Sequence, residues 1–200
     1  MTQIITSLAE ISDRYDALFC DLWGCVHDGL TPFAEAIAAM QTFRLKGGTV
    51  MLVTNAPRPH EPVRRQLESI GVPEDAYDGI ATSGDSARAA MFRGAVGENV
   101  YFIGQPQDQV FFSPLELIEN PVTITQVPVE EADGIICCGP FDSLADLEVM
   151  RPQFLLAKNK GLKLLCANPD IVVDRGDTRE WCAGALGQLY TELGGESLYF

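Results

Sequence analysis

Basic residues are scarce in this chain of 200 residues. Fourteen Lys and Arg residues stand against 28 Asp and Glu residues, which gives a net charge of −14 at pH 7. Nucleic acids and anionic membrane surfaces attract clustered positive charge, so the composition argues against both as the main partner. An anionic substrate would therefore need a locally positive site, such as a metal ion, a helix N-terminus or a lysine.

Long apolar runs and paired cysteines are also missing. No run approaches the roughly 20 residues of a membrane-spanning helix. Residues 1–16 lack the basic segment and apolar core of a signal peptide. The six cysteines form no Cys-x-x-Cys pair, and Cys20, Cys138 and Cys166 lie in or beside expected strands. This pattern favours reduced, buried thiols in a cytoplasmic protein, with a zinc site or a redox pair as alternatives.

The most informative stretch that is present runs from residue 17 to residue 29. Four apolar residues lead directly into Asp21, and a polar loop with Gly24 follows. The run predicts a strand over residues 17–22 that is buried on both faces. Asp21 then lies at the carboxyl end of the strand, where open α/β sheets bind their ligands. Because no basic residue is close in sequence, a metal ion or a reacting group is expected to balance this carboxylate.

The first 92 residues alternate between strand and helix patterns. Strands are expected over 17–22, 49–53 and 79–82, and helices over 33–46, 60–70 and 85–92, the last capped by Ser83. Such alternation predicts a parallel sheet with right-handed crossovers. Two of the strands end in polar residues, Asp21 and Thr54-Asn55. If these strands are neighbours, the polar groups converge on one crevice.

The rest of the chain repeats the pattern less regularly. Residues 1–16 are expected to form a short helix and a lead-in. Further strands are expected over 99–103, 122–126, 134–138 and 162–166, and helices over 143–158 and 180–193, with Pro152 kinking or splitting the first helix. A last strand, 197–200, ends the chain. Because α/β sheets usually continue into a loop and a helix, the sequence is expected to be cut short.

Several motifs occur in a recognisable order. They are Asp21-Leu22-Trp23-Gly24, His27-Asp28-Gly29, Thr54-Asn55, Thr82-Ser83-Gly84, Ala167-Asn168-Pro169-Asp170 and Cys182-Ala183-Gly184-Ala185-Leu186. The ordered set resembles the haloacid dehalogenase-like (HAD) hydrolases, in particular the class IIA branch that includes nitrophenylphosphatase-like enzymes. The first motif alone is weak evidence, but the set spans nearly the whole chain.

The resemblance implies an α/β fold with a Rossmann-like parallel-sheet core and an inserted α/β cap domain. By this analogy, residues 1–84 are the first part of the core, residues 85–175 the cap, and residues 176–200 an incomplete return to the core. The implied function is Mg²⁺-dependent hydrolysis of a small phosphorylated metabolite through an aspartyl-phosphate. Together with the unpaired cysteines, this predicts a cytoplasmic enzyme, and a homo-oligomer is left open.

The same resemblance assigns roles to individual residues. Asp21 is the expected nucleophile and a magnesium ligand, and the backbone carbonyl of Trp23 is the second metal ligand. Thr54 and Asn55 are expected to hydrogen-bond the phosphoryl oxygens. Arg58 is expected to add positive charge. The simpler alternatives are a turn-capping carboxylate at Asp21, a turn after the strand at Thr54 and a surface arginine at Arg58.

A second pair of expected substrate contacts lies late in the chain. Asn168 and Asp170 follow a strand of the expected cap and are candidates for reaching the substrate. An Asx-type turn around Pro169 explains the same residues equally well. His60, beside Pro59, is expected to be structural.

Two departures from the family pattern bear on activity. Phosphatases of the family carry a second aspartate two residues after the nucleophile, and this chain has Trp23 there. Because general acid–base help contributes about 10²–10⁴-fold, we expect weak phosphatase activity, a different proton donor or no turnover. His27 and Asp28 are the nearby substitutes, although a solvent-facing loop explains them better. The family's Gly-Lys-Pro motif and distal acidic loop would lie beyond Phe200.

Two other function classes therefore stay open. One is a non-catalytic or regulatory protein that keeps the fold and binds phosphate or metal. The other is carbon–halogen hydrolysis, since dehalogenases of the superfamily also lack the second aspartate. The α/β type of the expected cap argues against the second alternative.

Overall fold

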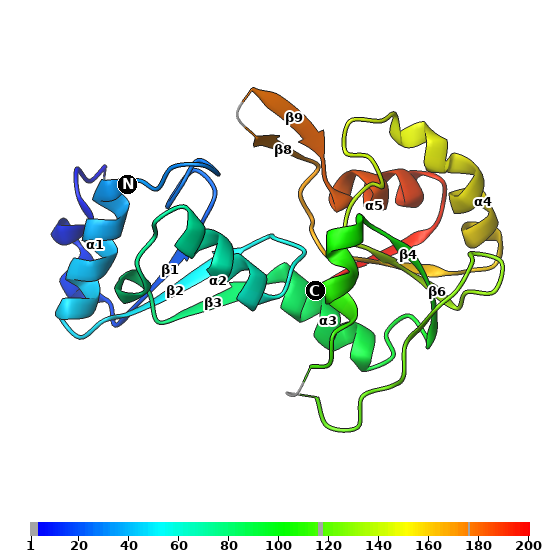
Figure 1. The fold of residues 1–200 in the computed structure, drawn as a ribbon, viewed down its shortest axis with the longest axis horizontal. Helices are drawn as coiled ribbons and strands as arrows, with labels where there is room; N and C mark the ends of the chain where they lie inside the picture. Colours follow the sequence, from blue (N-terminus) through cyan, green and yellow to red (C-terminus); the bar gives the residue numbers. More distant parts are fainter. Residues whose placement is uncertain (1–3, 116–117, 176) are drawn as a thin grey trace. The chain divides into compact units, whose positions relative to one another are not determined.

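The computed structural model describes residues 4–115, 118–175 and 177–200. Figure 1 traces the chain from its blue N-terminal part to its red C-terminal part. The residues divide into two compact units, and we describe each by itself. The first unit comprises residues 1–54 and 60–81, and the second comprises residues 55–59 and 82–200.

The first unit holds a three-stranded sheet in the order β1-β2-β3. The strands are β1 (Ala17–Asp21), β2 (Thr49–Thr54) and β3 (Gly79–Thr82), and the helices between them are α1 (Ala34–Leu45) and α2 (His60–Ser69). Three short 3₁₀ turns, η1 (Leu8–Glu10), η2 (Ser12–Arg14) and η3 (Glu74–Ala76), complete the unit. The expected alternation of strand and helix is confirmed, and β1 pairs with β2 in parallel.

Strand β1 is less buried than its composition predicts. Its residues alternate between exposed and half-buried, and Phe19 is 73% exposed. The expectation of a strand buried on both faces is therefore wrong. β1 lies at the edge of its sheet, and the face that carries Phe19 and its partner Met51 is only partly covered. The opposite face of the sheet is buried at Val50 and Leu52 of β2.

The second unit is built on a five-stranded sheet in the order β10-β7-β6-β4-β5. These strands are β4 (Asn99–Ile103), β5 (Thr125–Gln126), β6 (Gly134–Cys137), β7 (Lys163–Cys166) and β10 (Glu196–Tyr199). All neighbours in this sheet are parallel. The helices of the unit are α3 (Ser83–Phe92), α4 (Arg151–Asn159) and α5 (Ala183–Glu192), with 3₁₀ turns η4 (Pro106–Phe112) and η5 (Leu147–Met150).

Both faces of this sheet are buried. Ile135 of β6 belongs to one apolar cluster with Phe154 of α4 and Tyr190 of α5. The next residue, Ile136, belongs to the other cluster with Met91 of α3. Because side chains alternate along a strand, consecutive apolar residues fill two separate cores. The α/β class and parallel sheets expected from the sequence are confirmed.

The late part of the chain departs from the sequence expectations in two places. The expected helix over 143–158 is instead η5 followed by α4, and Pro152 lies in the first turn of α4. Proline is tolerated there because the first amides of a helix have no partner within it. The expected helix over 180–193 begins only at Ala183, because residues before it pair as an antiparallel hairpin of β8 (Val172–Arg175) and β9 (Thr178–Trp181).

Two smaller expectations also need correction. The N-cap of α3 is Thr82, whose hydroxyl accepts a hydrogen bond from the Asp85 amide at 2.9 Å, and Ser83 is the first helical residue. The strand expected over 122–126 is only the two-residue β5.

The structure groups the end of the chain with the second unit. β10 pairs with β7, so the final expected strand joins the sheet of the second unit, where the sequence had placed residues 176–200 with the core. The domain boundaries expected at 84/85 and 175/176 stay predictions. Among the described residues, no helix combines the length and apolar character needed to cross a membrane.

Candidate functional site

Asp21 lies at the carboxyl end of β1, as the sequence predicts. Its register partner on β2 is Val53, and Thr54 is the next residue, so both polar groups lie at the same edge of adjacent strands. The Asp21 Oδ1 atom accepts a hydrogen bond from the Leu22 amide at 2.8 Å. That bond orients the carboxylate of an exposed residue and leaves Oδ2 as the second oxygen for a ligand. Thr54 is 4% exposed.

The loop after β1 is held by backbone hydrogen bonds. The Leu22 carbonyl accepts from the amides of Val26 and His27, at 2.8 and 3.2 Å, and the Gly24 amide donates to the His27 carbonyl at 2.9 Å. Among the described residues, no backbone hydrogen bond outside the regular helices and strands ends on the Trp23 carbonyl. This oxygen therefore fits the role of metal ligand that the sequence assigns to it.

His27 is buried in this loop at 1% exposure. Its Nδ1 atom accepts a hydrogen bond from the Gly29 amide at 2.8 Å, and its ring packs edge-on against Trp23 with centroids 5.3 Å apart. Burial lowers the pKa of His27, while the nearby Asp28 and Asp21 carboxylates oppose that shift. The expectation that His27 faces solvent is not what the structure gives.

Asp28 forms a turn at the end of the same loop. Its Oδ1 atom accepts hydrogen bonds from the amides of Leu30 and Thr31 at 2.9 and 2.7 Å. The backbone donors, Thr31 first and Leu30 second, lower the pKa of this exposed carboxyl. Asp28 is therefore a charged acceptor at neutral pH.

In the second unit, Asn55 and Asp170 contact each other directly. The Asn55 Nδ2 atom donates to the Asp170 Oδ1 atom at 2.9 Å, across 115 residues of sequence. Asn168, which is 8% exposed, accepts the Asp170 amide through its side-chain oxygen at 2.9 Å. The Asx-type turn around Pro169 is thus present. Contact of Asn168 or Asp170 with a substrate stays a prediction.

Arg58 lies in segment 55–59, which belongs to the second unit although it comes early in the chain. Its positive charge acts on Asp108 of η4, which is 9% exposed. Burial raises the pKa of Asp108, and the Gln105 amide and Arg58 partly counter that shift. The half-buried Arg58 therefore has a nearby acidic group, which differs from a free surface arginine.

Gly84, a residue of the Thr82-Ser83-Gly84 motif, allows the segment 55–59 to lie close to α3. Its amide donates to the Ala56 carbonyl at 3.0 Å. A Cβ atom at this position would come 2.4 Å from the Arg58 carbonyl oxygen. The Ser83-Gly84 pair at a helix start was the available signal for a close backbone approach.

The oxygen atoms of Asp21 and of the Trp23 carbonyl are of the chemical type that binds magnesium. Magnesium is bound through one or two carboxylates, keeps several waters and takes further oxygens from a substrate phosphate. Asp21 Oδ2 and the Trp23 carbonyl are oxygen ligands of that type. Within residues 4–115, 118–175 and 177–200, no cluster of three or more His, Cys, Asp and Glu side chains is suited to a metal ion.

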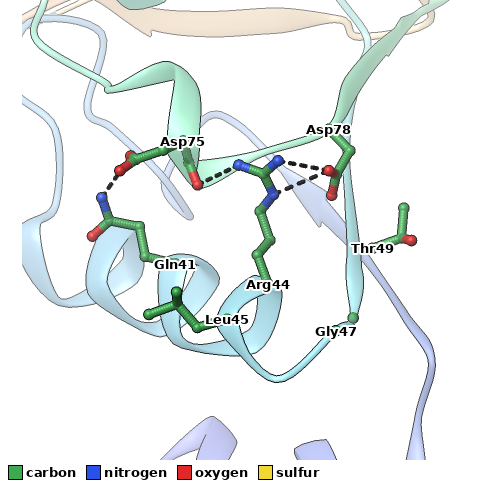
Figure 2. A pocket seen from close by; sticks show the side chains of 8 residues that line it. Gln41, Arg44, Leu45, Gly47, Thr49, Asp75 and Asp78 are labelled. Atoms are coloured by element: carbon green, nitrogen blue, oxygen red, sulfur yellow. Dashed lines mark hydrogen bonds and ion pairs between the residues drawn. The ribbon is translucent and has the colours of Figure 1, made fainter.

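A separate pocket of the first unit lies at the other end of the strands. Figure 2 shows Arg44 extending between Asp75 and Asp78. Its Nε and Nη2 atoms bind Asp78 Oδ1 at 3.1 and 2.7 Å, and its Nη1 atom binds the Asp75 carbonyl. Thr49, which lines this pocket, begins β2, whereas Thr54 ends it. Because its arginine is fully engaged, the pocket is a structural feature and is distinct from the candidate site.

Comparison with known proteins supplies the family context. The profile of the haloacid dehalogenase-like hydrolases matches residues 18–115. A crystal structure of a hydrolase of the haloacid dehalogenase-like family from Brucella suis is 41% identical, with a TM-score of 0.90 over 98% of this chain and 69% of that chain. Among curated proteins, no significant match is found.

Two more distant structures share the fold. A p-nitrophenyl phosphatase from Archaeoglobus fulgidus is 22% identical over 90% of this chain and 66% of that chain, with a TM-score of 0.65. A glycerol phosphate phosphatase from Mycobacterium tuberculosis in complex with magnesium is 20% identical over 94% of this chain and 55% of that chain, with a TM-score of 0.69. The chain thus spans between about half and about two thirds of the length of these proteins.

Proposed function

The chain belongs to the haloacid dehalogenase-like hydrolase family, and we propose that it hydrolyses small phosphate monoesters with Asp21 as the nucleophile. The match to the Brucella suis hydrolase carries the family assignment. Phosphatase names among the distant structures support the choice of a phosphate substrate. Asp21 and Thr54 at one edge of adjacent strands are the observation that carries the site assignment.

The chemistry follows from this placement. Asp21 Oδ2 attacks phosphorus, the bond to the leaving oxygen breaks, and water then releases phosphate from the aspartyl-phosphate. The Thr54 hydroxyl and the Asn55 amide are placed in sequence to bind phosphoryl oxygens, as such donors stabilise developing charge. A bound Mg²⁺, held by Asp21 and the Trp23 carbonyl, would supply positive charge against the phosphoryl oxygens. The Asn55 side chain is engaged with Asp170, so its backbone is the better candidate contact.

The direct test compares Asp21→Asn with Asp16→Asn. Both changes remove one negative charge, and Asp16 precedes β1 at the end opposite to Asp21. We expect the purified protein to hydrolyse p-nitrophenyl phosphate with Mg²⁺. Asp21→Asn should lower kcat/KM by about 10⁴-fold or to background, whereas Asp16→Asn should leave it unchanged. Equal activity in Asp21→Asn and wild type would refute the assignment of the nucleophile.

A non-catalytic phosphate- or metal-binding protein is the second candidate, and Trp23 is the observation that favours it. An indole carries a hydrogen-bond donor and no group that transfers a proton at neutral pH. Wild-type protein that binds inorganic phosphate with Mg²⁺ but hydrolyses no phosphate ester would support this candidate. Halide release from a small haloacid would instead support carbon–halogen hydrolysis.

The partner and the cellular location of the protein are part of the same proposal. A small phosphorylated metabolite is the proposed partner, and neither nucleic acid nor a membrane is proposed, since the net charge is −14. Among the described residues all six cysteines are free thiols, which supports a cytoplasmic location. A homo-oligomer remains open to measurement by light scattering.

A further inference from the structure

The second unit has a hollow on its surface beside helix α5, which we call the α5 hollow. Its volume is about 570 Å³, and its walls are residues 144–148, the two hairpin ends Ile171 and Trp181, and one side of α5. In Figure 1, β9 leads directly into α5, so the hairpin and the helix form adjoining walls. The volume falls within the range of about 300–1,000 Å³ that is usual for binding sites.

Backbone hydrogen bonds fix the walls of the α5 hollow in place. The Trp181 amide donates to the Ser143 carbonyl at 2.9 Å, which ties the hairpin to the loop before η5. The Cys182 amide donates to the Ile171 carbonyl at 2.9 Å, which ties the start of α5 to the start of the hairpin. The hollow is therefore preformed, and a ligand would not have to order its walls.

Three large apolar side chains at this hollow are open to solvent. Leu144 is 64% exposed, Ile171 41% and Trp181 39%, and all three line the hollow although they come from separate segments. Single exposed apolar residues are normal on a protein surface, but several gathered around one hollow mark an interaction site. Tryptophan in particular is frequent among the residues that dominate binding energy at interfaces.

The charged residues that line the α5 hollow are all acidic. They are Asp146, Glu148 and Glu192, and none of the described lining residues is basic. Arg151 of α4 pairs with Glu148, with its Nη2 atom 2.8 Å from Oε1. This hydrogen-bonded carboxylate raises the pKa of Arg151, with a smaller contribution from Glu192. Three carboxylates beside one guanidinium leave the rim with two negative charges in excess.

A second hollow extends the first along α5. Its volume is about 750 Å³, and it shares Ile171, Gln188 and Glu192 with the α5 hollow before reaching Tyr199 of β10. Tyr199 is itself 49% exposed. The two hollows together form a groove that suits a segment of polypeptide better than one small molecule.

We propose that the α5 hollow docks a segment of a partner protein that carries apolar side chains flanked by lysine or arginine. The apolar side chains pack on Leu144, Ile171 and Trp181, and the basic side chains face the acidic rim. Charge complementarity selects this partner over a second copy of the chain, because two molecules that each carry −14 repel one another. The inference does not depend on the proposed phosphatase function.

The experiment measures the binding of a labelled model peptide by fluorescence anisotropy. The probe is an amphipathic peptide of leucine and lysine, about 14 residues or four helical turns long. A serine and lysine peptide of the same length and charge is the control for attraction by net charge. We expect the leucine peptide to bind at least about 10-fold more tightly, because its apolar face is buried. Binding should also change the tryptophan emission of wild type, and much less that of Trp181→Phe.

Two sets of variants locate the binding site. Leu144→Ser should weaken binding of the leucine peptide by about 5-fold or more and leave the serine peptide unaffected. The double variant Asp146→Asn, Glu192→Gln should weaken binding of the leucine peptide by about 3-fold or more. Both substitutions keep the oxygens that accept the Glu148 amide and the Gln188 side chain, so the fold should be retained.

The double variant Glu130→Gln, Glu131→Gln is the matched control. It also removes two negative charges, and neither residue lines the groove. Equal weakening by the two double variants would overturn the inference, as would equal affinity for the leucine and serine peptides or no binding of the leucine peptide. Wild type that forms a dimer in light scattering, with the dimer lost in Leu144→Ser, would assign the hollow to a second copy and overturn it as well.

Discussion

At the scale of single residues, His27 links the loop to the pH dependence of stability. Its ring is buried, and its Nδ1 atom accepts the Gly29 amide. Protonation of Nδ1 would break that bond and bury a positive charge. Burial accordingly lowers the pKa of His27 below the ordinary value of 6.5. The unfolded chain takes up a proton at a higher pH than the folded chain does.

We therefore expect His27 to make the protein less stable in mild acid. Its contribution is fully present above pH 6.5 and is lost as pH falls from there through the folded pKa, by at most about 1.4 kcal/mol per pH unit. Urea unfolding of wild type and His27→Gln at pH 7.5 and 5.5 measures this contribution. Between pH 7.5 and pH 5.5, wild type should lose more free energy of unfolding than His27→Gln does. Equal losses in the two proteins would contradict the role of His27.

At the scale of elements, helix α3 shows how one polar residue positions a helix start. The Thr82 hydroxyl accepts the Asp85 amide, which would otherwise lack a partner within the helix. The neighbouring Ser83 was the residue expected from sequence, but it is already helical. Either residue type suits an N-cap, so only the backbone conformation decides between them.

Thr82→Ala should therefore lower the free energy of unfolding by about 1 kcal/mol. Thr82→Ser keeps a capping hydroxyl and should retain most of the wild-type stability. Ser83→Ala is the matched control and should change stability by less than about 0.5 kcal/mol. Thermal or urea unfolding followed by circular dichroism provides the measurement. A larger loss in Ser83→Ala than in Thr82→Ala would reverse the assignment of the cap.

At the scale of the whole molecule, the two units have separate cores. Leu52 is fully buried in the sheet of the first unit. Phe154 is fully buried in the second, where its ring lies 5.2 Å from that of Tyr190. Truncating such residues to alanine removes apolar contacts and leaves a cavity, at a cost of about 2–5 kcal/mol.

We expect each truncation to loosen mainly its own unit. Phe154→Ala should speed amide hydrogen exchange in peptides covering β6 and β7, with little change in peptides covering β1 and β2. Leu52→Ala should do the reverse. Hydrogen exchange followed by mass spectrometry measures both sets of peptides in one experiment. Equal loss of protection in both units from either substitution would show that they unfold as one body.

Local sequence patterns determined the α/β class, the order of most elements and the strand-end positions of Asp21 and Thr54. These features depend on short-range rules, because an apolar run, a capping residue and a glycine stop act within a few residues. Parallel pairing of β1 with β2 also follows locally, since consecutive strands joined by a helix usually become neighbours. The motif order further identified the family, which the comparison with the Brucella suis hydrolase confirms.

Only the tertiary structure decided the features that depend on distant residues. The exposure of Phe19 follows from the place of β1 at a sheet edge, which its own apolar composition cannot reveal. The side-chain hydrogen bond between Asn55 and Asp170 joins residues that are 115 positions apart in the sequence. Glycine at position 29 leaves room for a ring, but only the folded loop shows that the Trp23 indole occupies that room. Each depends on how separate segments pack, and a local pattern carries no record of that packing.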